Sequence, residues 1–291
     1  RVKQGPPISS SFAASSIGGF IEGSFGGDRY ADIEENGFQR PQNSPLSTFS
    51  IDVDTASYAN VRRFLNDGRR PPADAVRIEE LVNYFRYDYP TPRNGDPFSV
   101  NVEVAACPWE LEHRLVRVGL RGVEVDLSER PASNLVFLVD VSGSMNSHDK
   151  LPLLQKSLKM LVDQMTADDS ISLVVYAGSS GLVLPPTAGS DQDTIKTAID
   201  ELRAGGSTNG GEGIRLAYAQ AKENFIEDGI NRVILATDGD FNVGVTSDGE
   251  LTSLIEKNAK SGVFLSALGF GRGNLNDSMM EEITNKGNGN Y

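Results

Sequence analysis

The half of the chain that follows Pro131 alternates short apolar runs with amphipathic segments. The run at 135–139 is entirely apolar, which is typical of a parallel strand covered on both faces. The segment at 151–165 repeats its leucines with helical spacing and so predicts a helix with one apolar stripe. Further strands are expected at 171–176, 182–184, 233–236 and 263–268, and further helices at 194–202, 213–225 and 250–260. Such alternation predicts an α/β fold with a doubly wound, mostly parallel, Rossmann-like sheet, which binds ligands at the carboxyl ends of its strands.

Hydroxyl and carboxylate groups gather in three segments that this fold brings to that edge. They are Asp140, Ser142 and Ser144 after the first strand, Thr208 in a glycine-rich loop, and Asp238 after the strand at 233–236. An all-oxygen set suits a hard cation such as Mg²⁺ or Mn²⁺ and disfavours zinc or copper. We interpret Gly143 as the residue that lets the backbone turn so that both serines face one point, with the glycines around Thr208 acting likewise.

The pattern Asp140-x-Ser142-x-Ser144, followed by Thr208 and Asp238-Gly239, resembles the metal-ion-dependent adhesion site of the von Willebrand factor type A (vWA) family. The resemblance covers roughly residues 131–291. It implies that the serines and the threonine bind Mg²⁺ directly, with Mn²⁺ or Ca²⁺ as alternatives, while the aspartates act largely through water. It also implies an open metal position that an acidic side chain of a partner protein fills. Because the family normally continues beyond the equivalent of Tyr291, we expect a vWA domain that lacks its last strand and helix.

Residues 47–130 are expected to form a separate α+β extension. Alternation at 49–53 predicts a strand, Ser57 is expected to cap a helix at 57–65, and a second helix is expected at 74–87. The segments 98–105 and 115–123 predict an antiparallel pair of strands. The stretches 47–65 and 79–85 resemble the N-terminal extension of bacterial vWA proteins that are exported or lipid-anchored. That resemblance implies a location in the periplasm or on the outer surface, and it leaves room for a lipid anchor upstream.

Residues 1–46 are rich in glycine, serine and proline and predict an extended, low-complexity arm. The composition favours a flexible linker. Aromatic residues nevertheless recur through the arm, at positions 12, 20, 25, 30 and 38. A second hypothesis is therefore that the arm packs on the body of the protein, on a partner or on another copy of the chain.

The charge balance argues against nucleic acid as a partner. The chain has 27 Lys and Arg against 40 Asp and Glu, a net charge of −13, and its densest group of arginines, at 62–77, is interrupted by acidic residues. Cys107 is the only cysteine, which excludes an internal disulfide and a cysteine-based zinc cage. No apolar run approaches the ~20 residues needed to span a bilayer.

Three classes of function remain open. The first is a non-catalytic, metal-dependent protein-binding module, and the second is a scaffold that assembles through the arm while the metal stabilises the fold. The third, a metal-dependent hydrolase, is disfavoured because Asp140 replaces the first glycine of a Gly-x-Ser-x-Gly elbow. His148 is expected on an exposed helix entry, and no lysine or arginine is placed at the metal by the sequence. We therefore expect no catalytic residue.

Overall fold

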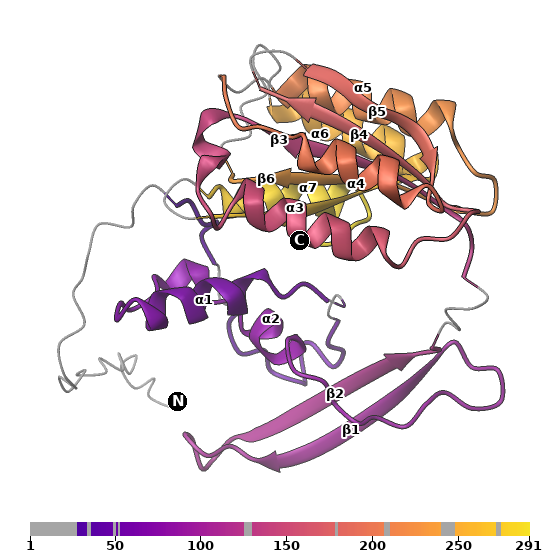
Figure 1. The fold of residues 1–291 in the computed structure, drawn as a ribbon. Coiled ribbons are helices and arrows are strands. Elements are labelled where there is room, and N and C mark those ends of the chain that lie inside the picture. Colours follow the sequence, from indigo (N-terminus) through magenta and orange to yellow (C-terminus); the bar gives the residue numbers. More distant parts are fainter. Residues whose placement is uncertain are drawn as a thin grey trace, which may run out of the picture.

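The computed structural model describes residues 28–33, 36–48, 51, 53–124, 130–177, 180–206, 210–239, 248–271 and 275–291. In Figure 1 the C-terminal half forms a sheet between two layers of helices. The N-terminal half forms a small helical unit below this sheet and a long hairpin that projects away from it.

The described part of the sheet has five strands in the order β5-β4-β3-β6-β7. Their bounds are Ser133–Asp140 (β3), Ser170–Tyr176 (β4), Ser180–Ala188 (β5), Ile230–Thr237 (β6) and Val263–Gly269 (β7). All neighbours are parallel except β5, which runs antiparallel to β4. The central strand β3 is buried along its whole length because helices cover both faces. The predicted doubly wound, mostly parallel sheet is confirmed.

Helices cover the two faces of this sheet in separate layers. They are α3 (Leu151–Val162) and α4 (Gln192–Asp200) on one face, and α5 (Gly210–Glu223), α6 (Asp248–Lys260) and α7 (Asp277–Lys286) on the other. Successive β3 residues point to opposite faces, so Phe137 packs with the first layer and Leu138 with the second. The sequence analysis missed α7, although Asn276 is a recognisable N-cap and accepts a hydrogen bond from the backbone N–H of Met279.

The extension contains two short α-helices, α1 (Ala56–Asn66) and α2 (Ile78–Asn83). The predicted cap at Ser57 is wrong, because Thr55 holds the N-cap position and the Ser57 hydroxyl donates to the carbonyl of Ala75. The predicted helix at 74–87 is also wrong in extent. The same hydroxyl accepts the backbone N–H of Arg77, the N-cap residue of α2, and a separate 3₁₀ turn at Ala73–Ala75 precedes that helix. Tertiary contacts thus replace the continuous helix that local periodicity favoured.

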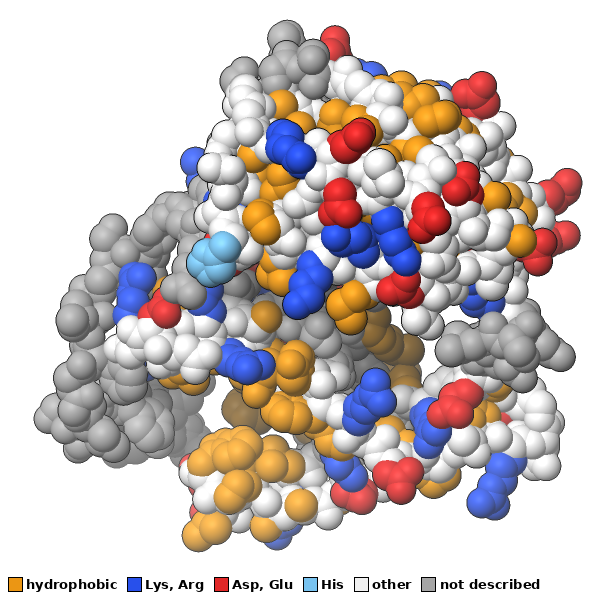
Figure 2. Space-filling model, viewed as in Figure 1, with side chains coloured by type: hydrophobic (Ala, Val, Ile, Leu, Met, Phe, Trp, Pro, Cys, Tyr) orange, Lys and Arg blue, Asp and Glu red, His pale blue; other side chains and the backbone are white. Residues whose placement is uncertain are grey.

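Strands β1 (Phe98–Ala106) and β2 (Arg114–Gly122) form the predicted antiparallel hairpin. Tyr89 packs against one face at Gly119, where an added Cβ would lie 2.3 Å from the tyrosine ring. The opposite face consists of aliphatic side chains that remain exposed, among them Val100, Val102, Val104 and Val116. In Figure 2 hydrophobic side chains gather at the lower-left end of this hairpin, while charged side chains lie along the rest of its visible face.

The strand predicted at 49–53 is not formed in the described residues of that segment. Ile51 and Val53 lie outside any strand and are exposed, while 49, 50 and 52 fall outside the described residues. Alternation of apolar and polar residues favours a strand only where a neighbouring strand supplies hydrogen bonds. Among the described residues, the hairpin sheet consists of β1 and β2.

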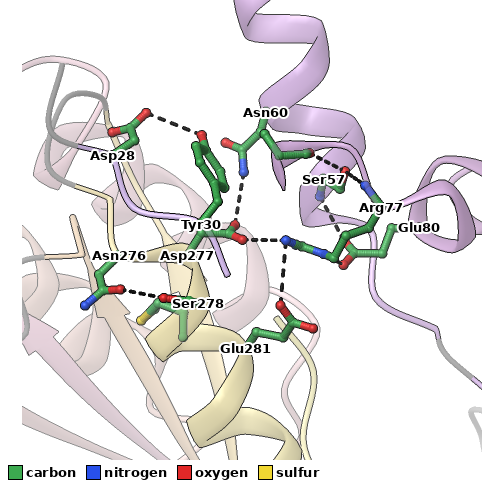
Figure 3. A network of polar contacts seen from close by, with 12 residues as sticks. Asp28, Tyr30, Ser57, Asn60, Arg77, Glu80, Asn276, Asp277, Ser278 and Glu281 are labelled. Atoms are coloured by element: carbon green, nitrogen blue, oxygen red, sulfur yellow. Dashed lines mark hydrogen bonds and ion pairs between the residues drawn. The ribbon is translucent and has the colours of Figure 1, made fainter. Parts of the chain in front are cut away.

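A network of buried polar side chains links the extension to α7 (Figure 3). The guanidinium of Arg77 pairs with Asp277 at the start of α7 and with Glu80 in α2. Asn60 of α1 donates to the other oxygen of Asp277 at 3.1 Å. Asp277 is completely buried, so its charge depends on these donors for stabilisation. The backbone N–H of Tyr291 donates to Asp54 and adds a further link.

Part of the arm also contacts the body. Asp28 accepts the backbone N–H of Leu275 and forms an ion pair with Arg63 at 2.6 Å. Arg29 forms a bridge with Asn276, next to α7. Residues 36–48 are exposed, including Phe38. The packing expected of the arm is therefore seen at residues 28–30, while residues 1–27 lie outside the described part.

We expect Arg77→Met to lower the free energy of unfolding by about 3–5 kcal/mol, because it leaves Asp277 and Glu80 buried without their shared cation. Urea unfolding measures this, and limited proteolysis should show faster cleavage between the extension and the parallel sheet. Arg70→Met, at an exposed arginine of the same segment, is the control. Equal stability of the two variants would contradict the role given to the network.

A further ion pair, between Arg130 and Asp169, joins the linker before β3 to the turn before β4. Asp169 accepts hydrogen bonds from the guanidinium of Arg130, from the backbone N–H of Ser133 and from both the N–H and the hydroxyl of Thr166. Burial by itself raises the pKa of Asp169, but these donors together hold it well below its usual range. The carboxylate therefore stabilises the folded chain in its charged form.

We expect Asp169→Asn to cost about 3 kcal/mol at pH 7 and much less at pH 2. Because the pKa is lower in the folded chain, the contribution is present above the unfolded pKa of about 3.9 and is lost as the pH falls through the folded value. Urea titrations of wild type and variant from pH 7 to pH 2 should converge. The exposed neighbour Asp168→Asn is the control, and a cost independent of pH would refute this account.

Candidate metal centre

Two of the predicted site residues meet because β3 and β6 are adjacent and parallel. Asp140 ends β3, and Asp238 directly follows Thr237, the last residue of β6. The register pairs Val139 with Ala236, so the two strands end at the same level. Both carboxylates are completely buried. Two like charges thus lie side by side, an arrangement that requires donors or a cation nearby.

Asp140 is held by donors on three sides. One oxygen accepts the backbone N–H of Ser142 at 2.8 Å, and the other accepts the hydroxyls of Thr237 at 3.0 Å and Tyr176 at 3.3 Å. Burial raises the pKa of Asp140 above its usual value and the Asp238 charge adds to this rise, against the hydrogen bonds from Ser142 and Thr237. Burial likewise raises the pKa of Tyr176, which keeps its hydroxyl a donor. Thr237 and Tyr176 are site residues that the sequence analysis missed.

The hydroxyl oxygens of Ser142 and Ser144 lie 2.9 Å apart. Ser142 is buried, whereas Ser144 is exposed. The pair therefore extends from the buried carboxylates to the protein surface. Adjacent ligands of an octahedral Mg²⁺ with bonds of about 2.0–2.1 Å are separated by about 2.9 Å. The serine pair therefore has the spacing of two neighbouring Mg²⁺ ligands.

Backbone hydrogen bonds bring the glycine-rich loop to the same place. Gly205 donates to the carbonyl of Val141 at 2.7 Å, and Gly143 donates to that of Gly206 at 3.2 Å. Gly206 has φ +87°, which supports the expected role of a glycine here. The role expected of Gly143 is wrong, since its φ is not positive and an added Cβ would meet only ordinary contact. Thr208 itself lies outside the described residues.

A lysine enters the site that the sequence analysis did not place there. The Lys150 ammonium, just before α3, donates to Asp238 at 2.8 Å. The lysine is largely buried, and its aliphatic stem lies against the backbone at Gly271. The expectation that no lysine reaches the site is therefore wrong. Sequence spacing could not reveal it, because the direction of this side chain depends on the loop after β7. His148 is exposed, as expected.

The donor set of this site fits a hard divalent cation. It consists of carboxylate and hydroxyl oxygens, the ligands that Mg²⁺ prefers. Within the described ranges no group of three or more His, Cys, Asp and Glu side chains could hold a metal, so a zinc-type or all-carboxylate cage is absent there. A cation here would depend on Ser142 and Ser144 as well as on Asp140 and Asp238.

In the described part of the chain, no helix has the length and apolar character needed to cross a bilayer.

The fold and this crest of hydroxyls and carboxylates define the class of protein. The chain belongs to the von Willebrand factor type A domain family, whose profile matches residues 134–291, more than half of the chain. A second profile, described as von Willebrand factor, matches residues 24–117 and so covers most of the extension. The resemblance to the vWA family stated from the sequence is confirmed.

Among named proteins, the chain is similar to the uncharacterized protein YfbK of Escherichia coli (strain K12), with 49% identity over 270 residues. The match covers 90% of this chain and 47% of YfbK, so the chain spans about half the length of that relative. A UPF0353 protein of Mycolicibacterium gilvum is 34% identical over 84 residues, which are 28% of this chain and 24% of that protein.

Solved structures show weaker likeness. BatB from Bacteroides thetaiotaomicron has a TM-score of 0.47 and 23% identity, and the match covers 55% of this chain and 89% of BatB. The manganese-loaded TRAP protein of Plasmodium vivax has a TM-score of 0.44 and 20% identity, over 53% of this chain and 62% of that one.

In chelator-treated protein we expect Asp140→Asn to leave the free energy of unfolding unchanged or to raise it by about 1 kcal/mol. The amide removes one of two adjacent buried charges, while its carbonyl still accepts from Ser142 and the Thr237 hydroxyl can accept from its NH₂. Urea unfolding tests this, with the exposed Asp163→Asn as control. A loss of more than 1 kcal/mol would contradict the view that Asp140 is a strained, functional carboxylate.

Proposed function

We propose that the protein is a non-catalytic, divalent-cation-dependent binding module that recognises an acidic side chain of another protein. Mg²⁺ is the proposed ion, with Mn²⁺ or Ca²⁺ as alternatives. Ser142, Ser144 and Thr208 would hold it through their hydroxyls, and Asp140 and Asp238 would act largely through water. The cation, when bound, supplies an electrophilic position open to a carboxylate. The interaction or adhesion function of the family supports this proposal.

The spacing of the two serine hydroxyls is the observation that carries the proposal. Their oxygens are 2.9 Å apart beside two fully buried carboxylates, and Ser144 is open to solvent. A structural metal site would be closed, whereas a recognition site needs one ligand position that an incoming group can reach. Neutral hydroxyl ligands also leave part of the cation charge uncompensated, which favours an anionic partner.

Each remaining residue of the centre has a task in this proposal. The backbone N–H of Ser142 and the hydroxyls of Thr237 and Tyr176 orient the Asp140 carboxylate. The hydrogen bonds of Gly205 and Gly206 with Val141 and Gly143 hold the described start of the glycine-rich loop against the serine loop. These supports keep the ligands in place before a cation arrives, which lowers the cost of binding.

We also propose that the protein acts at the bacterial cell envelope, in the periplasm or on the outer surface. The resemblance of the extension to those of exported bacterial vWA proteins supports this location. A scaffold in which residues 1–46 drive assembly is the alternative. The contacts of Asp28 and Arg29 with the body favour an arm held by its own chain over one free to join copies.

Calorimetric titration of Mg²⁺ and Mn²⁺ into chelator-treated protein tests the site. We expect saturable binding by the wild type and at least about tenfold weaker binding by Asp140→Ala, Ser144→Ala and Thr208→Ala, since each removes a ligand or its support. Ser147→Ala is the control, because its exposed hydroxyl in the same loop bonds to Asp149 instead.

Two results would count against the binding module. The first is equal metal affinity in wild type and Asp140→Ala. The second is ester or phosphate hydrolysis by the wild type that disappears in Ser142→Ala, which would favour a hydrolase. Assembly that persists in chelator but fails without residues 1–46 would favour the scaffold.

A further inference from the structure

Lys150 places a positive charge inside a centre otherwise built to receive a cation. Its ammonium lies 2.8 Å from Asp238, and that carboxylate is completely buried. A buried lysine is rare and requires a partner, so this contact is a specific feature of the site and not a surface pair.

A second element of the fold holds the lysine in this position. Gly271 lies just after β7 with φ +80°, and a Cβ there would lie 2.1 Å from Cε of Lys150 and 2.8 Å from its Cγ. Only glycine leaves room for the stem at this backbone conformation. The backbone of Lys150 is also fixed, because its N–H donates to Ser147 and its carbonyl accepts from Leu154.

We infer that Lys150 sets the net charge of the loaded centre, so that the centre binds its cation less tightly and an acidic ligand more tightly. This inference rests on the proposed function and specifies how the partner carboxylate is selected. Lys150 acts through Asp238 and is a positioning residue for recognition, not a ligand of the cation.

Charge counting gives the reason. Asp140, Asp238 and Lys150 together carry −1, and a divalent cation changes this to +1. One carboxylate from a partner then brings the centre to zero. Without Lys150 the loaded centre is already neutral, so an incoming carboxylate would gain less and the cation itself would gain more. The two effects of removing Lys150 therefore have opposite signs.

Isothermal titration of Mg²⁺ into chelator-treated wild type and Lys150→Met is the test, in sodium acetate and in sodium chloride of equal ionic strength. In chloride we expect Lys150→Met to bind Mg²⁺ at least about tenfold more tightly than the wild type, as expected for removal of a nearby unit charge. Acetate should tighten Mg²⁺ binding by the wild type, because the two ligands are linked, and should do so at least about threefold less in Lys150→Met.

Three controls separate charge from structure. Lys150→Arg keeps the charge and should stay within about threefold of the wild type in both salts. Lys159→Met makes the same substitution on α3 at a half-exposed lysine that pairs with Asp200, and it should change neither result. If Lys150→Met is unstable in chelator, Lys150→Gln and the dependence of the unfolding temperature on Mg²⁺ concentration give the same comparison.

The outcomes distinguish this inference from the proposed function. No saturable Mg²⁺ binding by the wild type in either salt would overturn both. Mg²⁺ binding by the wild type with equal affinity in Lys150→Met, or an equal effect of acetate on the two proteins, would overturn the inference about Lys150 alone. A merely structural lysine would weaken Mg²⁺ binding when removed, the opposite of the expected change.

Discussion

Two adjacent buried carboxylates, Asp140 and Asp238, determine which donor groups must surround the candidate metal centre. Their proximity follows from the pairing of β3 with β6, whose carboxyl ends lie at one level. Inside a protein such charges are tolerated only when donors or cations surround them. The Thr237 hydroxyl and the Ser142 backbone N–H donate hydrogen bonds to Asp140, and Lys150 forms an ion pair with Asp238. The centre is therefore electrostatically strained in a way that a divalent cation would relieve.

The extension is attached to the vWA domain by the same physical means. Asp277 is buried at the start of α7, and Arg77 and Asn60 from the extension supply its donors. Since α7 packs on the sheet through Met280 and Ile283, the extension is anchored to the core of the domain. Breaking one buried pair is costly because it strands the remaining charge. The candidate metal centre and the attachment of the extension thus each contain a buried carboxylate, Asp238 or Asp277, that is paired with a cationic residue distant in sequence.

Local patterns predicted the strands of the parallel sheet and the helices α3 to α6, because burial on both faces produces continuous apolar strands and burial on one side produces apolar helix stripes. They failed where side chains make tertiary contacts. Serine is a preferred helix N-cap residue, yet the Ser57 hydroxyl forms hydrogen bonds with the backbone of Ala75 and Arg77 elsewhere in the extension. The helix expected at 74–87 shortens to α2 for the same reason. The α7 helix was missed although Asn276 carries its capping signal.

The sequence by itself determined the order of strands and helices from β3 to β7, and the motif of Asp140, Ser142, Ser144, Thr208 and Asp238. These depend on periodicity and on short spacings, which are properties of a linear chain. Only the tertiary structure decided which distant residues serve the two carboxylates. Lys150 reaches Asp238 because Gly271, 121 positions later, leaves space for its stem, and Thr237 reaches Asp140 because β3 and β6 share a register. Such contacts depend on packing between elements, which no local pattern encodes.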